Sequence, residues 1–428
     1  MKQRRVVITG LGVVSPNGVG LPDFLQGLRE GRSGIRFIQN LKDLGFSCCI
    51  AGKPEVTEEM KLKYLTALQL RNFNSSGILY GCMAGIDAWK DAGLVIEPEG
   101  SVDFESGTVF GTGTSGVDKF REGIYLVDEG KVRRLGSTTV AQTMASGVSA
   151  YLSGILGLGN QVTTNSSACA TGTEAVLLGY ERIQNGKANR MLVGSCSDHG
   201  PYLWSGFDAM RVLTYKHNES PEKGSRPMSV TASGFVPGSG AGALVLEDLD
   251  SALERGARIY AEVLGGHVNS GGQRQGGTMT APNSEAVQRC IREAVKEAGV
   301  EADDIDVING HLTATVKDPT EIRNWKEALG RTKSNFPYIN SLKSMTGHGL
   351  AASGSLECVS SVLEIYHDFI FPSINSDDLH PEIEQEIESS RVPQSLIETR
   401  VNLVAKASFG FGDVNACVLF KKFDQDKK

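Results

Sequence analysis

Short apolar runs alternate with amphipathic stretches along most of the chain, and glycine-rich turns separate them. Short, mostly apolar runs predict buried strands at residues 6–8, 107–110, 191–194, 243–246, 259–264, 307–308, 338–339, 403–406 and 416–420. Apolar or small residues at helical spacing predict helices at residues 21–30, 78–93, 140–156, 284–298 and 350–366. Gly10 and Gly12 predict a tight turn directly after the first strand. The alternation is typical of the α/β class.

The pattern suggests two halves. A charge-rich segment, residues 247–258, separates two series of strands and helices. We therefore place an N-terminal half at residues 1–255 and a C-terminal half at residues 256–428. The helix that begins near residue 171 and the helix at residues 350–366 both follow a short strand and open with small residues. This similarity predicts halves of similar build with two close-packed central helices.

The stretch 163–186 places Cys169 where an extended segment turns into a helix. Unpaired backbone N–H groups and the positive end of the helix dipole meet there, a setting that lowers the pKa of a thiol. Small neighbours, Ala168, Ala170 and Gly172, allow a substrate or another backbone to come close. A buried structural cysteine on a packed helix is the alternative, and this stretch alone does not decide between them.

Composition narrows the function classes. The 428 residues carry a net charge of −7, which argues against a dedicated nucleic-acid-binding protein. Eight scattered cysteines show no CxxC and no metal-ligand spacing, as expected for a reducing compartment, and we predict no metal site. No apolar run approaches the 18 or so residues of a membrane span, and the first 16 residues fit a strand better than a signal peptide. We expect a cytoplasmic protein that does not contact membranes.

A glycine pattern at residues 111–116, G-x-G-x-x-G, follows a predicted strand. This is the dinucleotide-binding fingerprint, but its acidic partner could only be Asp128 and no clear βαβ spacing surrounds it. A turn that allows close backbone approach beside a buried site is the preferred interpretation.

Two histidines and a lysine complete a candidate constellation with Cys169. His311 and His348 lie in Gly- and Thr-rich loops after predicted strands, and Lys343 precedes His348 by five residues. A single cysteine with distant histidines is the pattern of a nucleophile whose partners are neighbours in space. His199, His217 and His267 lack such surroundings, and we interpret them as structural.

Several motifs in one order make the chain resemble the β-ketoacyl-[acyl-carrier-protein] synthases, closest to the type II elongating enzymes. They are VVITGLGVVSPNG (6–18), SSACATG (166–172), SRPMSVTASGFVPGSGAGALVLE (225–247), NGHLTAT (309–315), SLKSMTGH (341–348) and SFGFGDVNA (408–416). The resemblance implies the thiolase fold, five layers α-β-α-β-α in two similar halves, and a homodimer. It also implies decarboxylative condensation of an acyl thioester on Cys169 with malonyl-acyl-carrier protein, and no cofactor beyond the carrier's phosphopantetheine.

The resemblance further assigns roles to matching residues. His311 and His348 would hold the negative charge on the malonyl thioester oxygen, and Lys343, anchored by Glu357, would bias their protonation. Backbone N–H groups of Cys169 and Phe411 would form an oxyanion hole. The remaining assignments are Thr313 and Thr315 to the pantetheine arm, Phe411 and Thr114 to the gate and floor of the acyl pocket, and Phe409 to substrate contact.

The chain departs from the family pattern at four places. Leu312 replaces the glycine after the first histidine, Asp413 replaces a second glycine after Gly-Phe-Gly, and Leu342 replaces a small polar residue. The acidic pair that follows His311, Asp318 and Glu321, lies one residue nearer to it than usual. For docking the acidic carrier, the basic cluster expected at residues 68–72 is reduced to Arg71, whereas Arg133, Arg134 and Arg211 match basic positions.

Other functions are compatible with parts of the pattern. The pathway could be fatty-acid synthesis or a specialised lipid or polyketide route. A non-catalytic partner that sets chain length in a heterodimeric ketosynthase is the main alternative, although such partners typically lack the active-site cysteine. A nicotinamide-dependent enzyme that uses residues 111–116 is a further alternative.

Overall fold

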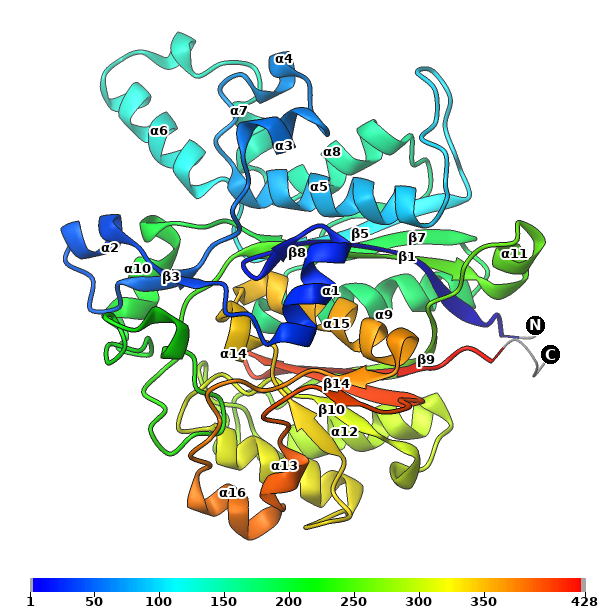
Figure 1. Cartoon of the computed structure of the whole chain (residues 1–428). Coiled ribbons are helices and arrows are strands. Elements are labelled where there is room, and N and C mark those ends of the chain that lie inside the picture. The colour runs from blue at the N-terminus through cyan, green and yellow to red at the C-terminus, as the bar shows by residue number, and fades with distance from the viewer. Residues whose placement is uncertain (1–2, 425–428) are drawn as a thin grey trace.

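A computed structural model describes residues 3–424 (Figure 1). It contains two sets of strands, one in each half, whose strands are arranged in the same order. In the N-terminal series the order is β6-β5-β7-β8-β1. Its strands are β1 (Val6–Ser15), β5 (Ser106–Thr112), β6 (Val162–Thr163), β7 (Arg190–Ser197) and β8 (Gly240–Asp248). The pairs β5–β6 and β5–β7 are parallel, whereas β7–β8 and β8–β1 are antiparallel.

The C-terminal series repeats this arrangement in the order β11-β10-β14-β15-β9. Its strands are β9 (Ala261–Ser270), β10 (Val307–Asn309), β11 (Tyr338–Asn340), β14 (Leu403–Gly410) and β15 (Val414–Lys421). The pairs β10–β11 and β10–β14 are parallel, whereas β14–β15 and β15–β9 are antiparallel. A short antiparallel pairing of β1 with β9 joins the two series. The prediction of two halves of similar build is confirmed.

Helices cover both series and separate them, which gives five layers (Figure 1). One outer layer contains α5 (Ser76–Asp91) and α8 (Gly147–Leu156), and the other contains α12 (Ser284–Ala298) and α13 (Asp318–Leu329). Between the sheets lie α9 (Thr171–Gln184) and α15 (Ser353–His367). The predicted α-β-α-β-α thiolase fold is therefore confirmed. No helix of residues 3–424 combines the length and the apolar character needed to cross a bilayer.

The two central helices touch through glycine. A Cβ on Gly172 of α9 would lie 2.2 Å from the Ser355 backbone nitrogen, and one on Gly354 of α15 would lie 2.6 Å from the Thr173 nitrogen. Only glycine lets the two backbones come this close. The predicted close packing is confirmed, and it brings the segments that precede both helices to one place.

The predicted turn at Gly10 and Gly12 is wrong. β1 continues through both glycines to Ser15 and is buried along its length. A Cβ at Gly10 would lie 2.1 Å from the carbonyl oxygen of Ala88, and one at Gly12 would lie 1.9 Å from that of Ala84. The glycines thus let α5 lie directly on the strand. Gly111, inside β5, has a similar role against Thr171, as the close-approach interpretation of residues 111–116 predicted.

Several boundaries also differ from the prediction. The helix predicted at residues 140–156 is split into α7 (Thr139–Thr143) and α8. The other helices are α1 (Leu21–Glu30), α2 (Gln39–Asp43), α3 (Glu58–Leu62), α4 (Ala67–Leu70), α6 (Val117–Asp128), α10 (Pro201–Ala209), α11 (Leu249–Glu254), α14 (Lys343–Thr346) and α16 (Pro381–Glu386). Short 3₁₀ turns include η1 (Val132–Arg134), η2 (Ala168–Ala170) and η5 (Leu350–Ala352). Small strand pairs are β3 (Ile35–Phe37) with β4 (Ile50–Gly52), β12 (Phe369–Ile370) with β13 (Ile397–Glu398), and β2 (Gly18–Val19) on β1.

Candidate active site

A cavity of about 550 Å³ opens where loops of the two halves meet. Cys169, His311 and His348 line it, and one ligand atom from each lies within 4.8 Å of the others. His311 lies 142 residues after Cys169 in the sequence, and His348 lies 37 residues after His311. The repeated fold brings the three together because each follows a strand. Aromatic side chains line the same cavity, namely Phe235, Phe409 and Phe411.

The chain turns sharply into Cys169. Ala168, the preceding residue, has φ +49°, a left-handed conformation that costs a non-glycine residue about 1–3 kcal/mol. The Thr171 hydroxyl stabilises the turn, since it donates to the Ala168 carbonyl at 2.7 Å and accepts from the Ser167 N–H at 2.9 Å. Opposite, a Cβ on Gly410 would lie 3.1 Å from the Cys169 nitrogen, so a side chain there would crowd the turn. The turn places the sulfur just before α9, as predicted.

The predicted lowering of the Cys169 pKa is wrong for the free protein. Burial raises the pKa of this thiol to about 11, although the side chain is partly exposed toward the cavity. The charge of Lys343 and the backbone N–H groups of Phe411 and of Cys169 itself lower the pKa, as the helix-start argument expected, but they offset only part of the burial effect. The resting residue is therefore a thiol at neutral pH.

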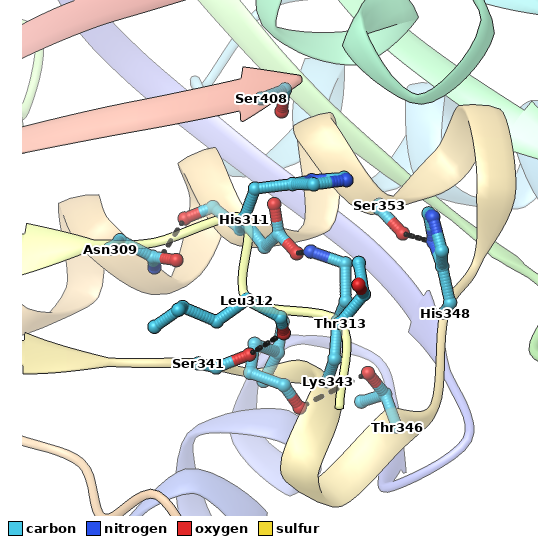
Figure 2. A network of polar contacts seen from close by, with 12 residues as sticks. Asn309, His311, Leu312, Thr313, Ser341, Lys343, Thr346, His348, Ser353 and Ser408 are labelled. Carbon is cyan, nitrogen blue, oxygen red and sulfur yellow. Dashed lines mark hydrogen bonds and ion pairs between the residues drawn. The ribbon is translucent and has the colours of Figure 1, made fainter. Parts of the chain in front are cut away.

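The hydrogen bonds of His348 fix its tautomer. Its Nδ1 accepts from the Leu350 backbone N–H at 3.1 Å and lies 2.9 Å from the Ser353 hydroxyl (Figure 2). Because a backbone N–H can only donate, Nδ1 carries the lone pair and the proton of the neutral ring sits on Nε2. Burial, Lys343 and Lys406 lower the pKa of His348 well below its ordinary value. The ring is therefore a neutral N–H donor.

His311 stands edge-on to His348, with ring centroids 5.4 Å apart and planes at 82°. Burial is the main cause that lowers its pKa well below the ordinary value, and Lys343, His348 and Lys406 add to it. Within residues 3–424 its Nδ1 is buried without a hydrogen-bond partner. Two neutral imidazoles thus face one thiol.

Two buried carboxylates hold the His311 loop. Glu321 accepts from the N–H groups of His311 at 2.7 Å and Leu312 at 2.8 Å. Asp318 accepts from four further N–H groups, those of Thr313 (3.0 Å), Ala314 (3.1 Å), Thr315 (3.4 Å) and Met228 (2.8 Å). Burial raises the pKa of Glu321 to about 7 and that of Asp318 to about 6. In the sequence the acidic pair lies one residue nearer to His311 than in the family motif, yet both carboxylates accept hydrogen bonds from the backbone of the loop.

The cluster of Cys169, His311 and His348 also has the composition of a metal site. A metal ion needs the lone pair of the ring nitrogen that faces it. In His348 that nitrogen carries the proton, since Leu350 occupies Nδ1. In this hydrogen-bonded form His348 is a donor to an anion and not a neutral metal ligand.

Comparisons with known proteins agree with this geometry. The sequence model of the β-ketoacyl synthase N-terminal domain matches residues 3–252, and that of the C-terminal domain matches residues 260–377. The chain belongs to the β-ketoacyl synthase family. It is 35% identical over 425 residues to 3-oxoacyl-[acyl-carrier-protein] synthase 1 of Escherichia coli K12, with 98% of this chain and 99% of that protein covered. It is also 35% identical to 3-oxoacyl-[acyl-carrier-protein] synthase 2 of a Synechocystis strain, with 99% of each chain covered.

Solved structures show the same likeness. The synthase superimposes with a TM-score of 0.86 and 27% identity on a type II polyketide ketosynthase in complex with its acyl-carrier protein and bound to the hexaketide. That comparison covers 98% of this chain and 100% of the other. The protein is accordingly a condensing enzyme of the acyltransferase class.

A buried ion-pair cluster, Lys343–Glu357–Lys406, lies beneath the two histidines of the synthase. Lys343 donates to Oε1 of Glu357 (Figure 2), and Lys406 lies 2.7 Å from Oε2. The three side chains are at most 2% exposed. Lys343 and Glu357 were predicted as partners, whereas Lys406 was missed. Its signal was a charged residue inside an otherwise apolar strand, residues 403–409.

The family departure at Leu312 has a structural explanation. Its side chain is fully buried in the apolar core of the C-terminal half, and its φ is +21°. Ser341 donates to its carbonyl at 2.9 Å (Figure 2). The leucine thus replaces the flexibility of a glycine with an apolar anchor for the His311 loop.

The remaining predicted site residues lie in three places. Thr313 and Thr315 line the cavity, with hydroxyls 3.1 Å apart, and Phe411 lies at its wall, 6.1 Å from the ring of Phe207. Thr114 does not line this cavity: it borders a separate one of about 470 Å³ beside α6. The synthase has four predicted docking arginines, all exposed and without an ion pair to residues 3–424, namely Arg71, Arg133, Arg134 and Arg211. Arg211 adjoins Val212 of the cavity wall.

Proposed function

We propose that the synthase condenses an acyl group held on Cys169 with malonyl-acyl-carrier protein and releases CO2 and 3-oxoacyl-acyl-carrier protein. The observation that carries this proposal is a thiol within 4.8 Å of two imidazoles at a cavity of about 550 Å³. Family membership supports the reaction class, and the relatives from Escherichia coli and Synechocystis are 3-oxoacyl-[acyl-carrier-protein] synthases.

The first half-reaction is thioester exchange. The sulfur of Cys169 attacks the acyl carbonyl, the pantetheine thiol leaves, and the Cys169 proton is carried away with it. Negative charge that develops on the carbonyl oxygen would be held by the N–H groups of Cys169 and Phe411, which already lie beside the sulfur. Because the free thiol has a pKa of about 11, the nucleophilic anion forms only as this attack proceeds.

The second half-reaction needs donors for an enolate. The carboxylate of the malonyl group leaves as CO2, and its bonding electrons move onto the thioester oxygen. Nε2–H of His348 and the neutral ring of His311 would hold this oxygen, which favours loss of CO2. The enolate carbon then attacks the acyl carbonyl on Cys169, the new C–C bond forms, and the thiolate leaves.

Substrates would arrive on the phosphopantetheine arm of an acyl-carrier protein, with no other cofactor. Thr313 and Thr315 border the cavity where this arm would enter, and the solved complex of a related ketosynthase with its carrier supports the partnership. The exposed arginines, Arg133 and Arg134 first, would dock the acidic carrier. Phe409 and Phe411 would border the acyl group, and the cavity beside Thr114 would take its far end.

The assembly is also a proposal. We place the halves at residues 1–255 and 256–428 and propose a homodimer. Exposed apolar side chains on α6, among them Phe120 and Ile124, support a covered surface on the N-terminal half. A non-catalytic chain-length partner is not favoured, because the thiol and both imidazoles line one cavity and the lysine is present, paired with Glu357.

Intact mass spectrometry tests the function. The protein is mixed with a panel of acyl-carrier proteins, and we expect one acyl group to be retained by the wild type and none by Cys169→Ala. Adding malonyl-acyl-carrier protein should then release 3-oxoacyl product. Cys49→Ala, whose thiol lies outside the cavity, is the matched control and should behave as wild type. Retention of the acyl group by Cys169→Ala would contradict the proposal.

A further inference from the structure

Lys406 is a fully buried lysine in the middle of β14. Its ammonium group lies 2.7 Å from Oε2 of Glu357, donates to the Ser408 hydroxyl at 2.7 Å, and donates to the Ala407 carbonyl. Two of the three N–H donors of the ammonium thus have hydrogen-bond acceptors, and the Glu357 carboxylate is its ion-pair partner. Such pairing is what allows a charge to stay buried. Lys406 is therefore a fixed cation in the molecular interior.

This cation shares Glu357 with Lys343. The carboxylate of Glu357 gives one oxygen to each lysine, so neither lysine can take both. With all three groups ionised, the cluster carries a net charge of +1. Ser408 extends the contacts to the helix behind Cys169, since its hydroxyl lies 3.0 Å from that of Thr173 on α9. The cluster thus links the elements that carry the thiol and the histidines.

The two imidazoles experience the charge of this cluster. The charged groups near the imidazoles are Lys343 on α14, Glu357 on α15 and Lys406 on β14. In addition, Asp318 and Glu321 of α13 accept hydrogen bonds from the loop of His311. Cys169 is the other titratable group that faces them. Both lysines lower the pKa of both histidines, whereas only Lys343 is among the causes that lower the pKa of the Cys169 thiol. Lys406 is therefore one of the causes that lower the pKa of both histidines.

We propose that Lys406 is a positioning residue for the condensation: it holds one oxygen of Glu357, leaves the other for Lys343, and keeps the cluster positive so that His311 and His348 stay neutral donors. It acts through Glu357 and touches no substrate. The inference rests on the proposed function, because neutral imidazoles matter only if they hold an enolate oxygen.

The test is the pH profile of malonyl-acyl-carrier protein decarboxylation. Lys406→Met removes the charge at similar length and takes the cluster to a net charge of 0. The imidazoles should then protonate at higher pH than in wild type, and the ratio of variant to wild-type rate should fall about three- to tenfold across the acid limb of the wild-type profile. Asp318 and Glu321 titrate in both proteins, so the ratio removes their effect. Lys119→Met is the matched control, since Lys119 is also buried but pairs with Glu122 on α6.

A charge-compensated variant separates electrostatics from packing. Lys406→Met combined with Glu357→Gln leaves Lys343 as the only charge, which restores +1, and its ratio should be nearly flat again. Glu357→Gln alone gives +2 and should move the acid limb to lower pH than in the double variant. If Lys406→Met alone does not fold, the comparison of Glu357→Gln with the double variant tests the role of Lys406.

Two results would overturn the inference. One is a folded Lys406→Met protein whose ratio is flat across the acid limb of the wild-type profile, and the other is identical acid limbs for Glu357→Gln and the double variant. Wild-type protein without decarboxylation activity would instead count against the proposed function itself, so the two failures are distinguishable.

Discussion

The backbone N–H of Leu350 lies 3.1 Å from Nδ1 of His348 and thereby decides where the proton of that ring sits. Leu350 is held in the left-handed region, with φ +53°, at the start of η5. An unusual backbone conformation, which costs about 1–3 kcal/mol, is thus linked to the tautomer of a candidate catalytic group.

His348 should be replaceable in part by another N–H donor. We expect His348→Ala to lower malonyl decarboxylation about 10²- to 10³-fold, the scale of one oxyanion donor, and His348→Gln to retain clearly more because its amide can donate from a similar position. The rate of CO2 release measures this. His267→Ala, which removes a ring paired with Glu297, should match wild type. Equal loss in the Ala and Gln variants would exclude a simple donor role.

Cys169 should react as a thiol of high pKa. With a pKa of about 11, the thiolate fraction and hence the rate of iodoacetamide alkylation should rise about tenfold per pH unit from pH 8 to pH 10. Lys343→Met removes the strongest cause that lowers this pKa, so alkylation should slow at each of these pH values. Lys406→Met should leave the rate nearly unchanged. Peptide mapping of the adduct measures all three proteins, and a pH-independent wild-type rate would refute the assignment.

Glu321 should make stability depend on pH. Its pKa is raised from 4.5 to about 7 in the folded protein, so the folded state binds the proton more tightly than the unfolded state does. The contribution to stability is complete below about pH 4.5 and is lost as the pH rises through 7, by roughly 3 kcal/mol in all. Glu321→Gln cannot titrate, so its free energy of unfolding relative to wild type should increase from pH 5 to pH 8. Urea unfolding measures this difference, and one that stays constant would contradict the shifted pKa.

Asp413 should hold the segment 271–283 that borders the cavity. Its carboxylate accepts from the N–H groups of Gln273 at 3.0 Å and Asn283 at 2.8 Å. Asp413→Gly suits the local φ of +62° but loses both bonds, and Asp413→Asn keeps one good acceptor. Amide hydrogen exchange in residues 271–283 should be fastest in the Gly variant, intermediate in the Asn variant and slowest in wild type. Equal exchange in all three would show that the segment is held by other contacts.

The arginines of η1 should affect the carrier and not the chemistry. Reversing Arg133 and Arg134 to Glu should raise KM for acyl-carrier protein about tenfold and leave short thioester mimics unaffected, since the charges are exposed and lie outside the cavity. Reversal of two exposed residues elsewhere, Lys187 and Arg400, is the matched control. Equal effects on carrier and mimic would exclude a docking role.

The sequence was most informative about reactive side chains that directly follow a strand. Cys169, His311 and His348 each follow a predicted extended segment, and a repeated fold brings such positions together, so the pattern predicted both the halves and the cluster. The glycines of β1 were misread because a glycine that permits helix contact looks the same as a glycine in a turn.

Other features depend on the combined effect of residues that are far apart in the sequence, which no local pattern reveals. The pKa of Cys169 is set by burial from both halves against a few N–H groups and one lysine, and only the assembled cavity fixes that balance. Thr114 borders a different cavity from Cys169, which spacing could not show. Lys406 was overlooked because its strand was read as apolar, although a lysine between buried residues is itself a sign of a paired internal charge.

The glycine contact between α9 and α15 has a consequence for inhibitors. Since Gly172 and Gly354 pin the two helices together at their first turns, both positive helix ends point permanently toward one small volume. An electrophile that carries a negative charge should therefore enter this pocket more readily than a cationic compound of the same shape. Because the glycine contact fixes the distance between the helices, this preference should not change with movements of the helices.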